Sequence, residues 1–212
     1  MVKRKGLFVT LEGPDGVGKS TQARLLAAAL RRSGRRVTLT REPGGSPRSA
    51  MIRALVLDPA LRGLAPGAEL LLFAADRRQH VADTIAPALE RGDLVLCDRF
   101  TDSTTAYQGA GRALDARAVA GINAFAAAGL VPDLTLLYDL PVAAGLERAR
   151  RRGPRDRMER STSDYFTRVR RGFQRLARRE PGRVKLISVE GRTPREVRDE
   201  GLSHLAGLLG RR

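Results

Sequence analysis

One segment of the chain has the residue types and spacing of a phosphate-binding loop. It reads Gly13-Pro14-Asp15-Gly16-Val17-Gly18-Lys19-Ser20 and matches the pattern G-x-x-x-x-G-K-[ST]. Glycines let backbone N–H groups converge on phosphate oxygens, and the start of a following helix adds positive potential. Lys19 can neutralise charge on the β- and γ-phosphates, and the Ser20 hydroxyl is an oxygen ligand of the kind that Mg²⁺ prefers. The segment therefore predicts a site for a nucleoside triphosphate and magnesium.

The stretches on either side of this loop are the elements that the motif requires. Residues 6–12 have the apolar character of a buried strand. The stretch after the loop carries apolar residues at helical spacing, from Ala23 to Leu30, and Ser33-Gly34 ends it. A strand, a glycine-rich loop and a helix in this order form a βα unit around the phosphates. We expect Thr21, at the start of the helix, to belong to the same ATP site.

Strands and helices alternate along the rest of the chain. Apolar runs predict further strands at residues 37–40, 94–98, 134–139 and 184–189. Helical spacing predicts helices at about 49–57, 68–91 and 115–128, after 139 as far as 152, from 163 and from 194, with an interruption of the second near Pro87. This alternation predicts an α/β fold in which helices cover both faces of a parallel sheet and ligands bind beyond the carboxyl ends of its strands.

Length and composition describe one domain spanning residues 1–212. The longest apolar runs fall short of the roughly 18 residues that span a bilayer, and the basic N-terminus runs into a strand without a signal core. We therefore expect a cytoplasmic protein with no membrane partner. The single cysteine, Cys97, lies in an apolar run and is interpreted as a small buried hydrophobe.

The net charge of +16 raises the question of a nucleic-acid partner. All but four of the 39 basic residues are arginine, and they are spread over many segments. Aromatic residues make up 4% of the chain, and no platform of interleaved aromatic and basic residues is visible. We expect no nucleic-acid partner.

A phosphate-binding loop alone leaves the reaction class open. A GTPase would need a guanine-reading Asn-Lys-x-Asp segment, which the sequence lacks, and a motor or helicase would bring further domains. The sequence favours a small-molecule kinase. Two other classes stay open: an ATPase stimulated by DNA or RNA, and a regulatory module that binds ATP without turnover.

Four further segments carry a resemblance to a known family. They are Thr40-Arg41-Glu42-Pro43-Gly44-Gly45, Phe73-Ala74-Ala75-Asp76-Arg77, Asp98-Arg99-Phe100 and Tyr107-Gln108-Gly109-Ala110-Gly111-Arg112. With the phosphate-binding loop, they resemble the bacterial thymidylate kinases over essentially the whole chain. The resemblance implies Mg²⁺-dependent transfer of the γ-phosphoryl group of ATP to dTMP, for dTTP synthesis. It also implies a P-loop NTPase fold with a five-stranded parallel sheet and a short basic lid, usually in a homodimer.

The identity of the acceptor base leaves one alternative open. A thymine methyl group contributes only about 1–3 kcal/mol of discrimination in an apolar pocket. A related nucleoside monophosphate kinase with another pyrimidine acceptor is therefore the alternative.

The resemblance also implies a set of dTMP-binding residues. Phe73 and Arg77 are spaced i, i+4 on one helix, so a ring and a guanidinium share a face where they can stack on a base and donate to its carbonyl. Without the family pattern, Phe73 would be read as a core residue. Arg53 and Arg99 are expected to hold the dTMP phosphate, although Arg53 also fits a solvated helix face. The remaining members of the set are Asp15, Glu42, Ser103, Thr104, Tyr107 and Gln108.

Three of these residues have a more specific expected role. Asp15 is expected to face the sugar 3′-hydroxyl and the metal, with a turn residue as its alternative. Tyr107 would crowd a 2′-hydroxyl and so favour deoxyribose. Glu42 is expected to orient a metal-bound water or a pocket arginine, or to be a simple turn residue.

Metal and lid residues complete the prediction. Asp98 ends a buried strand in the position of a Walker-B carboxylate, so we expect Ser20 and Asp98 to bind Mg²⁺. Residues 148–160, approximately, are arginine-rich and resemble the lid that closes over ATP. Gly16 stands where some relatives place an arginine, so the lid is expected to supply that charge through Arg152 and Arg157. The predicted catalytic set is Asp15, Lys19, Arg99, Arg152 and Arg157.

Overall fold

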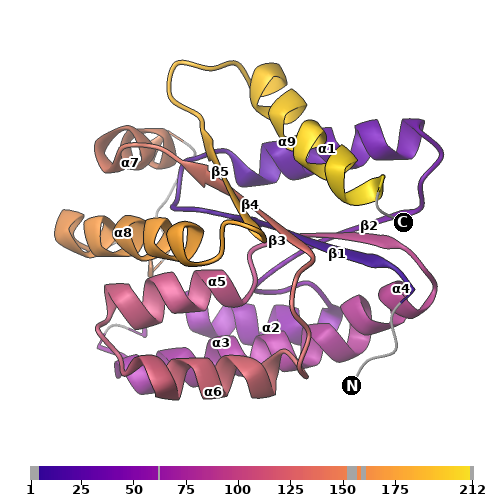
Figure 1. Cartoon of the computed structure of the whole chain (residues 1–212). Helices are drawn as coiled ribbons and strands as arrows, with labels where there is room; N and C mark the ends of the chain where they lie inside the picture. The colour runs from indigo at the N-terminus through magenta and orange to yellow at the C-terminus, as the bar shows by residue number, and fades with distance from the viewer. Residues whose placement is uncertain (1–4, 62, 152–156, 159–160, 211–212) are drawn as a thin grey trace.

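A parallel β-sheet in the strand order β2-β3-β1-β4-β5 forms the centre of the molecule (Figure 1). The computed structural model describes residues 5–61, 63–151, 157–158 and 161–210. The strands are β1 (Leu7–Glu12), β2 (Val37–Arg41), β3 (Leu94–Asp98), β4 (Leu134–Asp139) and β5 (Val184–Ser188). All neighbouring strands run parallel, so their carboxyl ends meet at one edge, as the sequence predicts.

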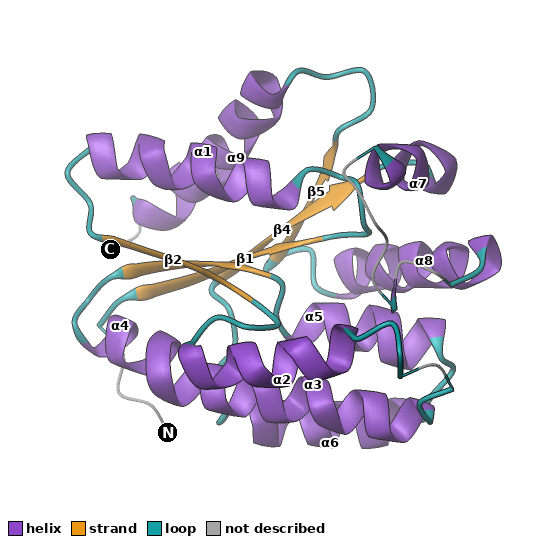
Figure 2. Cartoon of the chain, turned by 180° about the vertical axis from the view of Figure 1, so that it is seen from behind, coloured by secondary structure: helices purple, strands orange, loops and turns teal. Residues whose placement is uncertain are grey.

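Helices cover both faces of this sheet (Figures 1 and 2). On one face, α1 (Lys19–Arg32) and α9 (Pro194–Leu209) pack through Leu26 and Leu205 against alternate residues of β1 and β4. The other face carries α2 (Pro47–Leu57), α3 (Pro66–His80), α4 (Ala86–Glu90), α6 (Ala116–Ala126) and α8 (Ser163–Arg179). Successive strand residues point to opposite faces, so a sheet covered on both needs strands that are apolar throughout. The α7 helix (Val142–Arg150) follows β4.

The long helix predicted at 68–91 contains a wider turn. It consists of α3, a π-helical segment at Val81–Ile85 (η1) and α4. The N–H of Ala86 donates to the carbonyl of Val81, five residues back. Pro87, next in the chain, has no N–H to donate. The interruption expected near Pro87 is present as a π-helical turn between α3 and α4.

One helical region was not predicted. It consists of α5 (Thr101–Thr104) and a π-helical segment at Thr105–Gly111 (η2). The stretch is rich in Thr, Ser and Gly and has no apolar stripe of its own. Its backbone packs tightly on α8, where a Cβ added at Gly172 would lie 3.2 Å from the Ala106 Cα. Tertiary packing, rather than local preference, therefore stabilises this helix.

The other elements lie close to their predicted ranges. The strand predicted at 184–189 ends at Ser188, and α7 ends at Arg150. In the part of the chain that the structure describes, no helix combines the length and apolar character needed to cross a bilayer.

Candidate active site

The phosphate-binding loop joins β1 to α1 and depends on two close backbone contacts. Gly13 and Gly16 have φ angles of 136° and 79°. A Cβ atom would lie 2.2 Å from the Tyr138 carbonyl oxygen at Gly13, and 2.0 Å from the Gly145 carbonyl oxygen at Gly16. Among the described side chains, none caps the start of α1. The first N–H groups of that helix are thus available to phosphate oxygens.

Lys19 lies folded over this loop. Its Nζ donates to the carbonyl oxygens of Gly13 at 2.9 Å and Pro14 at 2.6 Å. Burial, together with the nearby Arg99 guanidinium, lowers the pKa of Lys19 to about 8. Burial of the ammonium group therefore has a cost in solvation, which an anionic ligand would offset.

The oxygen atoms expected to bind magnesium lie together. The Ser20 hydroxyl donates to Asp98 Oδ2 at 2.6 Å, which brings the start of α1 to the end of β3. Both residues line the same cavity. A hydroxyl and a carboxylate are hard oxygen ligands, and Mg²⁺ is usually held by one or two such groups together with phosphates and water. The pair fits a magnesium site.

Arg99 connects the phosphate-binding loop to the acceptor side. Its Nη1 donates to the Gly13 carbonyl and to Ser103 Oγ, both at 3.1 Å. Its Nη2 donates to Asp15 Oδ1 at 2.6 Å and to the Tyr107 hydroxyl at 3.1 Å. The Tyr107 hydroxyl in turn donates to Asp15 Oδ2 at 2.8 Å. Asp15, Arg99 and Tyr107 form one hydrogen-bonded group, and Arg99 has a φ of 78°, which is unusual for a residue other than glycine.

Glu12, which the sequence did not single out, holds this turn in place. Its Oε1 accepts from the Phe100 N–H at 2.7 Å and the Ser103 N–H at 3.3 Å, and its Oε2 accepts from the Ser103 hydroxyl at 2.5 Å. Burial and the Asp102 carboxylate raise the pKa of Glu12 to about 8. The signal in the sequence was an acidic residue at the end of an apolar strand, directly before the loop.

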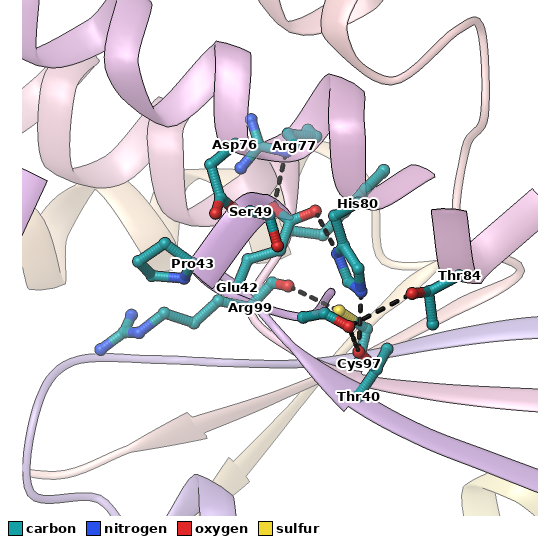
Figure 3. Close-up of polar contacts among 12 residues, drawn as sticks. Thr40, Glu42, Pro43, Ser49, Asp76, Arg77, His80, Thr84, Cys97 and Arg99 are labelled. Carbon is teal, nitrogen blue, oxygen red and sulfur yellow. Dashed lines mark hydrogen bonds and ion pairs between the residues drawn. The ribbon is translucent and has the colours of Figure 1, made fainter. Parts of the chain in front are cut away.

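Arg77, a predicted base-binding residue on α3, contacts Glu42 of the loop after β2 (Figure 3). Arg77 Nε donates to Glu42 Oε2 at 2.8 Å, and Nη1 donates to Thr104 Oγ1 and Asn123 Oδ1 at 2.9 Å each. Of the roles considered for Glu42, the geometry matches the orientation of a pocket arginine. Asn123 was not predicted, because a single Asn on a helix has no distinguishing sequence pattern.

Asp76 supports the same loop from α3. Its Oδ1 accepts from the Gly44 N–H at 2.8 Å, and its Oδ2 is buried without a partner among the described residues. Burial and the charge of Glu42 raise the pKa of Asp76 to about 7. The carboxyl group therefore holds the loop after β2 in place.

A cavity of about 690 Å³ joins the phosphate-binding loop to the predicted dTMP-binding residues. Asp15, Lys19 and Ser20 line its donor side, and Phe73 and Arg77 line its acceptor side. The cavity is also lined by other predicted residues, Gly16, Gly18, Thr21, Glu42, Arg53, Asp98, Arg99, Ser103, Thr104, Tyr107 and Gln108. The structure thus gathers most of the predicted site residues around one space, although Gly13, Pro14 and Val17 of the loop are not among the described residues that line it. Arg53, whose Nη1 donates to the Pro43 carbonyl at 2.8 Å, points to this space rather than to a solvated helix face.

Arg157, one of the two predicted lid arginines, is not among the described residues that line this cavity. Arg157 Nη1 is paired with Glu69 Oε2 at 2.7 Å, and Gln108 Nε2 donates to Glu69 Oε1 at 2.9 Å. In this conformation the structure does not bring Arg157 to the phosphate-binding loop. Arg152 lies outside the described residues. Arg148, near the end of α7, belongs to the predicted lid segment but was not named as a site residue, and it lines the cavity.

Comparisons with known proteins agree with this geometry. The family model described as thymidylate kinase matches residues 11–200. The chain is 52% identical over 182 residues to a thymidylate kinase of Pseudomonas syringae pv. tomato, which covers 86% of this chain and 87% of that protein. It is 47% identical over 209 residues to one of Trichlorobacter lovleyi, covering 94% and 99%.

A solved structure is also similar to this chain, and it too is a thymidylate kinase. The crystal structure of thymidylate kinase from Ehrlichia chaffeensis superposes with a TM-score of 0.78 at 33% sequence identity, covering 95% of this chain and 98% of that chain. The chain therefore belongs to the thymidylate kinase family, enzymes that phosphorylate dTMP with ATP on a P-loop NTPase fold.

Proposed function

We propose that this chain transfers the γ-phosphoryl group of ATP to the 5′-phosphate of dTMP inside the cavity described above. The observation that carries the proposal is that one cavity is lined both by the phosphate-binding loop and by the Phe73 and Arg77 pair. A site with only the loop would suit any nucleotide-binding protein. A second set of base- and phosphate-binding groups facing it suits a kinase with a nucleotide acceptor, and nothing in the site favours a different pyrimidine.

The donor half consists of residues 13–21 with Asp98. Backbone N–H groups of the loop and the start of α1 bind the triphosphate, and Lys19 moves from the loop carbonyls to the β- and γ-phosphates. Ser20 and Asp98 would hold Mg²⁺, which would supply positive charge to offset that of the triphosphate.

The acceptor half consists of Arg99, Arg53, Phe73 and Arg77, with Asp15, Glu42, Ser103, Thr104, Tyr107 and Gln108 around them. Arg53 and Arg99 bind the 5′-phosphate, and Phe73 and Arg77 bind the base. Tyr107, held by Asp15 and Arg99, leaves little room for a 2′-hydroxyl. Transfer is direct and in line, so these residues contribute by aligning the phosphates and neutralising charge.

The lid arginines are part of the same proposal. Arg152 and Arg157 reach the transferred group when both nucleotides are bound, and they exclude water from it. For Arg157 this requires its pairing with Glu69 to be exchanged for one with phosphate. Arg157→Ala is expected to lower kcat far more than it weakens dTMP binding.

We also propose a cytoplasmic homodimer. Large apolar side chains are exposed on three neighbouring helices of one layer (Figure 1): Met51 on α2 is 75% exposed, Leu71 on α3 is 58% exposed and Phe125 on α6 is 79% exposed. Large exposed apolar side chains on adjacent helices are a feature of many interfaces between protein chains.

A coupled ADP-release assay tests the activity. Purified protein, ATP and Mg²⁺ are supplied with dTMP, dUMP, CMP, UMP, AMP or GMP in turn, and dTMP is expected to give the highest kcat/KM. A better acceptor among the others would refute the assignment of dTMP. Lys19→Ala is expected to abolish transfer while the protein keeps its thermal unfolding transition, and retained turnover would remove the loop from the mechanism.

A further inference from the structure

Arg77 is bound on two of its three nitrogens and retains one donor group. Nε is occupied by Glu42, and Nη1 is occupied by Thr104 and Asn123. Among the described residues, none accepts a hydrogen bond from Nη2, although Arg77 is almost fully buried and lines the cavity. Nη2 is therefore the donor that remains for a ligand.

His80 is bound to the other oxygen of the same carboxylate. Its Nδ1 lies 3.1 Å from Glu42 Oε1, and both side chains are buried (Figure 3). An ionised carboxylate can only accept, so Nδ1 carries the proton of this bond. The Nε2 atom lies 2.7 Å from Thr40 Oγ1, whose hydroxyl can donate to it. Both ring nitrogens of His80 are thus accounted for, and Glu42 is shared between an imidazole and a guanidinium.

Because Glu42 binds both His80 and Arg77, it cannot bind Arg77 in the way that a carboxylate usually binds a guanidinium. A carboxylate beside a guanidinium favours two parallel N–H bonds, one to each oxygen. From the side on which Glu42 lies, those two donors would be Nε and Nη2 of Arg77. With Oε1 held by His80, only Oε2 is available, and Glu42 takes Nε alone.

We propose that His80 is a positioning residue for the acceptor base. By occupying Glu42 Oε1, it prevents Glu42 from accepting the Nη2 hydrogen on the Nε side of Arg77, so both hydrogens of Nη2 remain available to a carbonyl oxygen of thymine in dTMP. The inference rests on the proposed acceptor site. It adds to that site a residue that touches no substrate and acts through two intermediate side chains.

A bound metal ion is a less suitable explanation of this cluster. Ligand atoms of Glu42, His80 and Cys97 lie within 4.8 Å of one another. However, burial and the charges of Glu42 and Asp98 raise the pKa of the Cys97 thiol well above its usual value. The thiol donates to the Arg99 carbonyl at 3.0 Å, and a protonated thiol is not a metal ligand. With Arg77 already pairing the carboxylate, the cluster is a closed hydrogen-bond network.

Two variants of His80 test the inference against each other. The amide of His80→Asn falls near the Nδ1 position and can still donate to Glu42, whereas the amide of His80→Gln falls near Nε2 and reaches only Thr40. At saturating ATP, His80→Gln is expected to raise the KM for dTMP about tenfold, with the KM for ATP unchanged. Its preference for dTMP over dCMP should also fall, because cytosine has an amino group where thymine has a carbonyl. His80→Asn is expected to stay near the wild-type KM for dTMP.

Equal effects of the two variants on the KM for dTMP, or no effect of His80→Gln, would overturn the inference and leave His80 a structural residue. If His80→Gln does not fold, Glu42→Asp tests the same bridge, because the shorter acid cannot reach both partners. It is expected to raise the KM for dTMP, and an unchanged KM would again overturn the inference.

Arg77→Ala separates this inference from the proposed site. If Arg77→Ala raises the KM for dTMP while His80→Gln does not, the base site stands and the role of His80 falls. If Arg77→Ala leaves the KM for dTMP unchanged, the assignment of the base site falls, and the role of His80 with it.

Discussion

At the scale of single residues, the site depends on charged groups that are buried before any nucleotide is bound. Lys19 is held by two backbone carbonyls, and its pKa is lowered to about 8. Glu12, behind it, has a pKa raised to about 8. Both shifts have burial as their main cause, which disfavours the charged form of each group. The proton content of the free site therefore changes just above neutral pH.

This shift makes ATP binding dependent on pH. Below pH 8, Lys19 in the free protein carries its charge, and above pH 8 it loses it. The triphosphate favours the charged form, so the Kd for ATP is expected to rise as the pH increases from 7 to 9, with a limit of about tenfold per pH unit for one proton. Isothermal titration with ATP and Mg²⁺ at several pH values measures this.

Lys19→Arg is the matched control, because arginine keeps its charge over this range. Its Kd for ATP is expected to be weaker at pH 7 but flat up to pH 9. A slope that persists in this variant would assign the pH dependence to Glu12, and not to Lys19.

At the scale of elements, the loop between β2 and α2 is held in place from α3. Asp76 accepts from the Gly44 N–H, and His80 packs against Gly45. A Cβ added at Gly45 would lie 2.1 Å from His80 Nε2 and 2.5 Å from the Arg41 carbonyl oxygen. The lack of a side chain at this position is thus what allows His80 to lie beside Glu42.

Gly45→Ala is accordingly expected to disturb both packing and acceptor binding. Overpacking of this kind typically lowers the free energy of unfolding by about 1–3 kcal/mol. The KM for dTMP should rise with it, because His80 must move. Urea unfolding and steady-state kinetics measure the two effects.

Gly67→Ala, in the first turn of α3, provides the comparison. An added Cβ there has no described atom within 4 Å, so this variant is expected to be neutral or to gain up to about 1 kcal/mol of helix stability. If Gly45→Ala behaved like Gly67→Ala, the close contact with His80 would have no energetic significance.

The same scale shows what a sequence can predict. The elements around residues 13–20 followed from the motif and from apolar periodicity, since β1 and α1 have strong local patterns. The helix at 101–111 was missed because its stability comes from Glu12, Asn123 and α8, which are distant in the chain. Local patterns cannot report such contacts.

The site residues also fall into two groups: those that a sequence motif indicates, and those that only contacts in the folded chain reveal. Lys19, Ser20 and Asp98 belong to spaced motifs, and Phe73 and Arg77 to a family pattern. Glu12, His80 and Asn123 are buried polar residues whose partners become known only when the chain is folded. The position of Arg157 against Glu69 depends on conformation, which residue types do not encode.

At the scale of the whole molecule, α2, α3 and α6 lie together in one layer (Figure 2). Each of these helices carries a large apolar side chain that is exposed to solvent. If this layer forms the proposed homodimer interface, Phe125→Asp should weaken association at least about tenfold, because it would bury a charge. Sedimentation velocity at several protein concentrations measures this. Val131→Asp, which alters another exposed apolar residue outside these three helices, is the control. A Phe125→Asp protein that sediments like wild type would remove α6 from the interface.

The central position of β1 also affects how the protein comes to be folded. β1 is made first, yet both of its neighbours, β3 and β4, begin only at Leu94 and Leu134. During synthesis, a strand whose six residues are all buried in the finished enzyme must therefore leave the ribosome without a partner. Sheets whose neighbouring strands are distant in the sequence fold slowly, and their strands stay exposed until the partner strands pair with them. The newly made first half of the chain therefore contains a buried strand that has neither of its sheet neighbours until β3 is made.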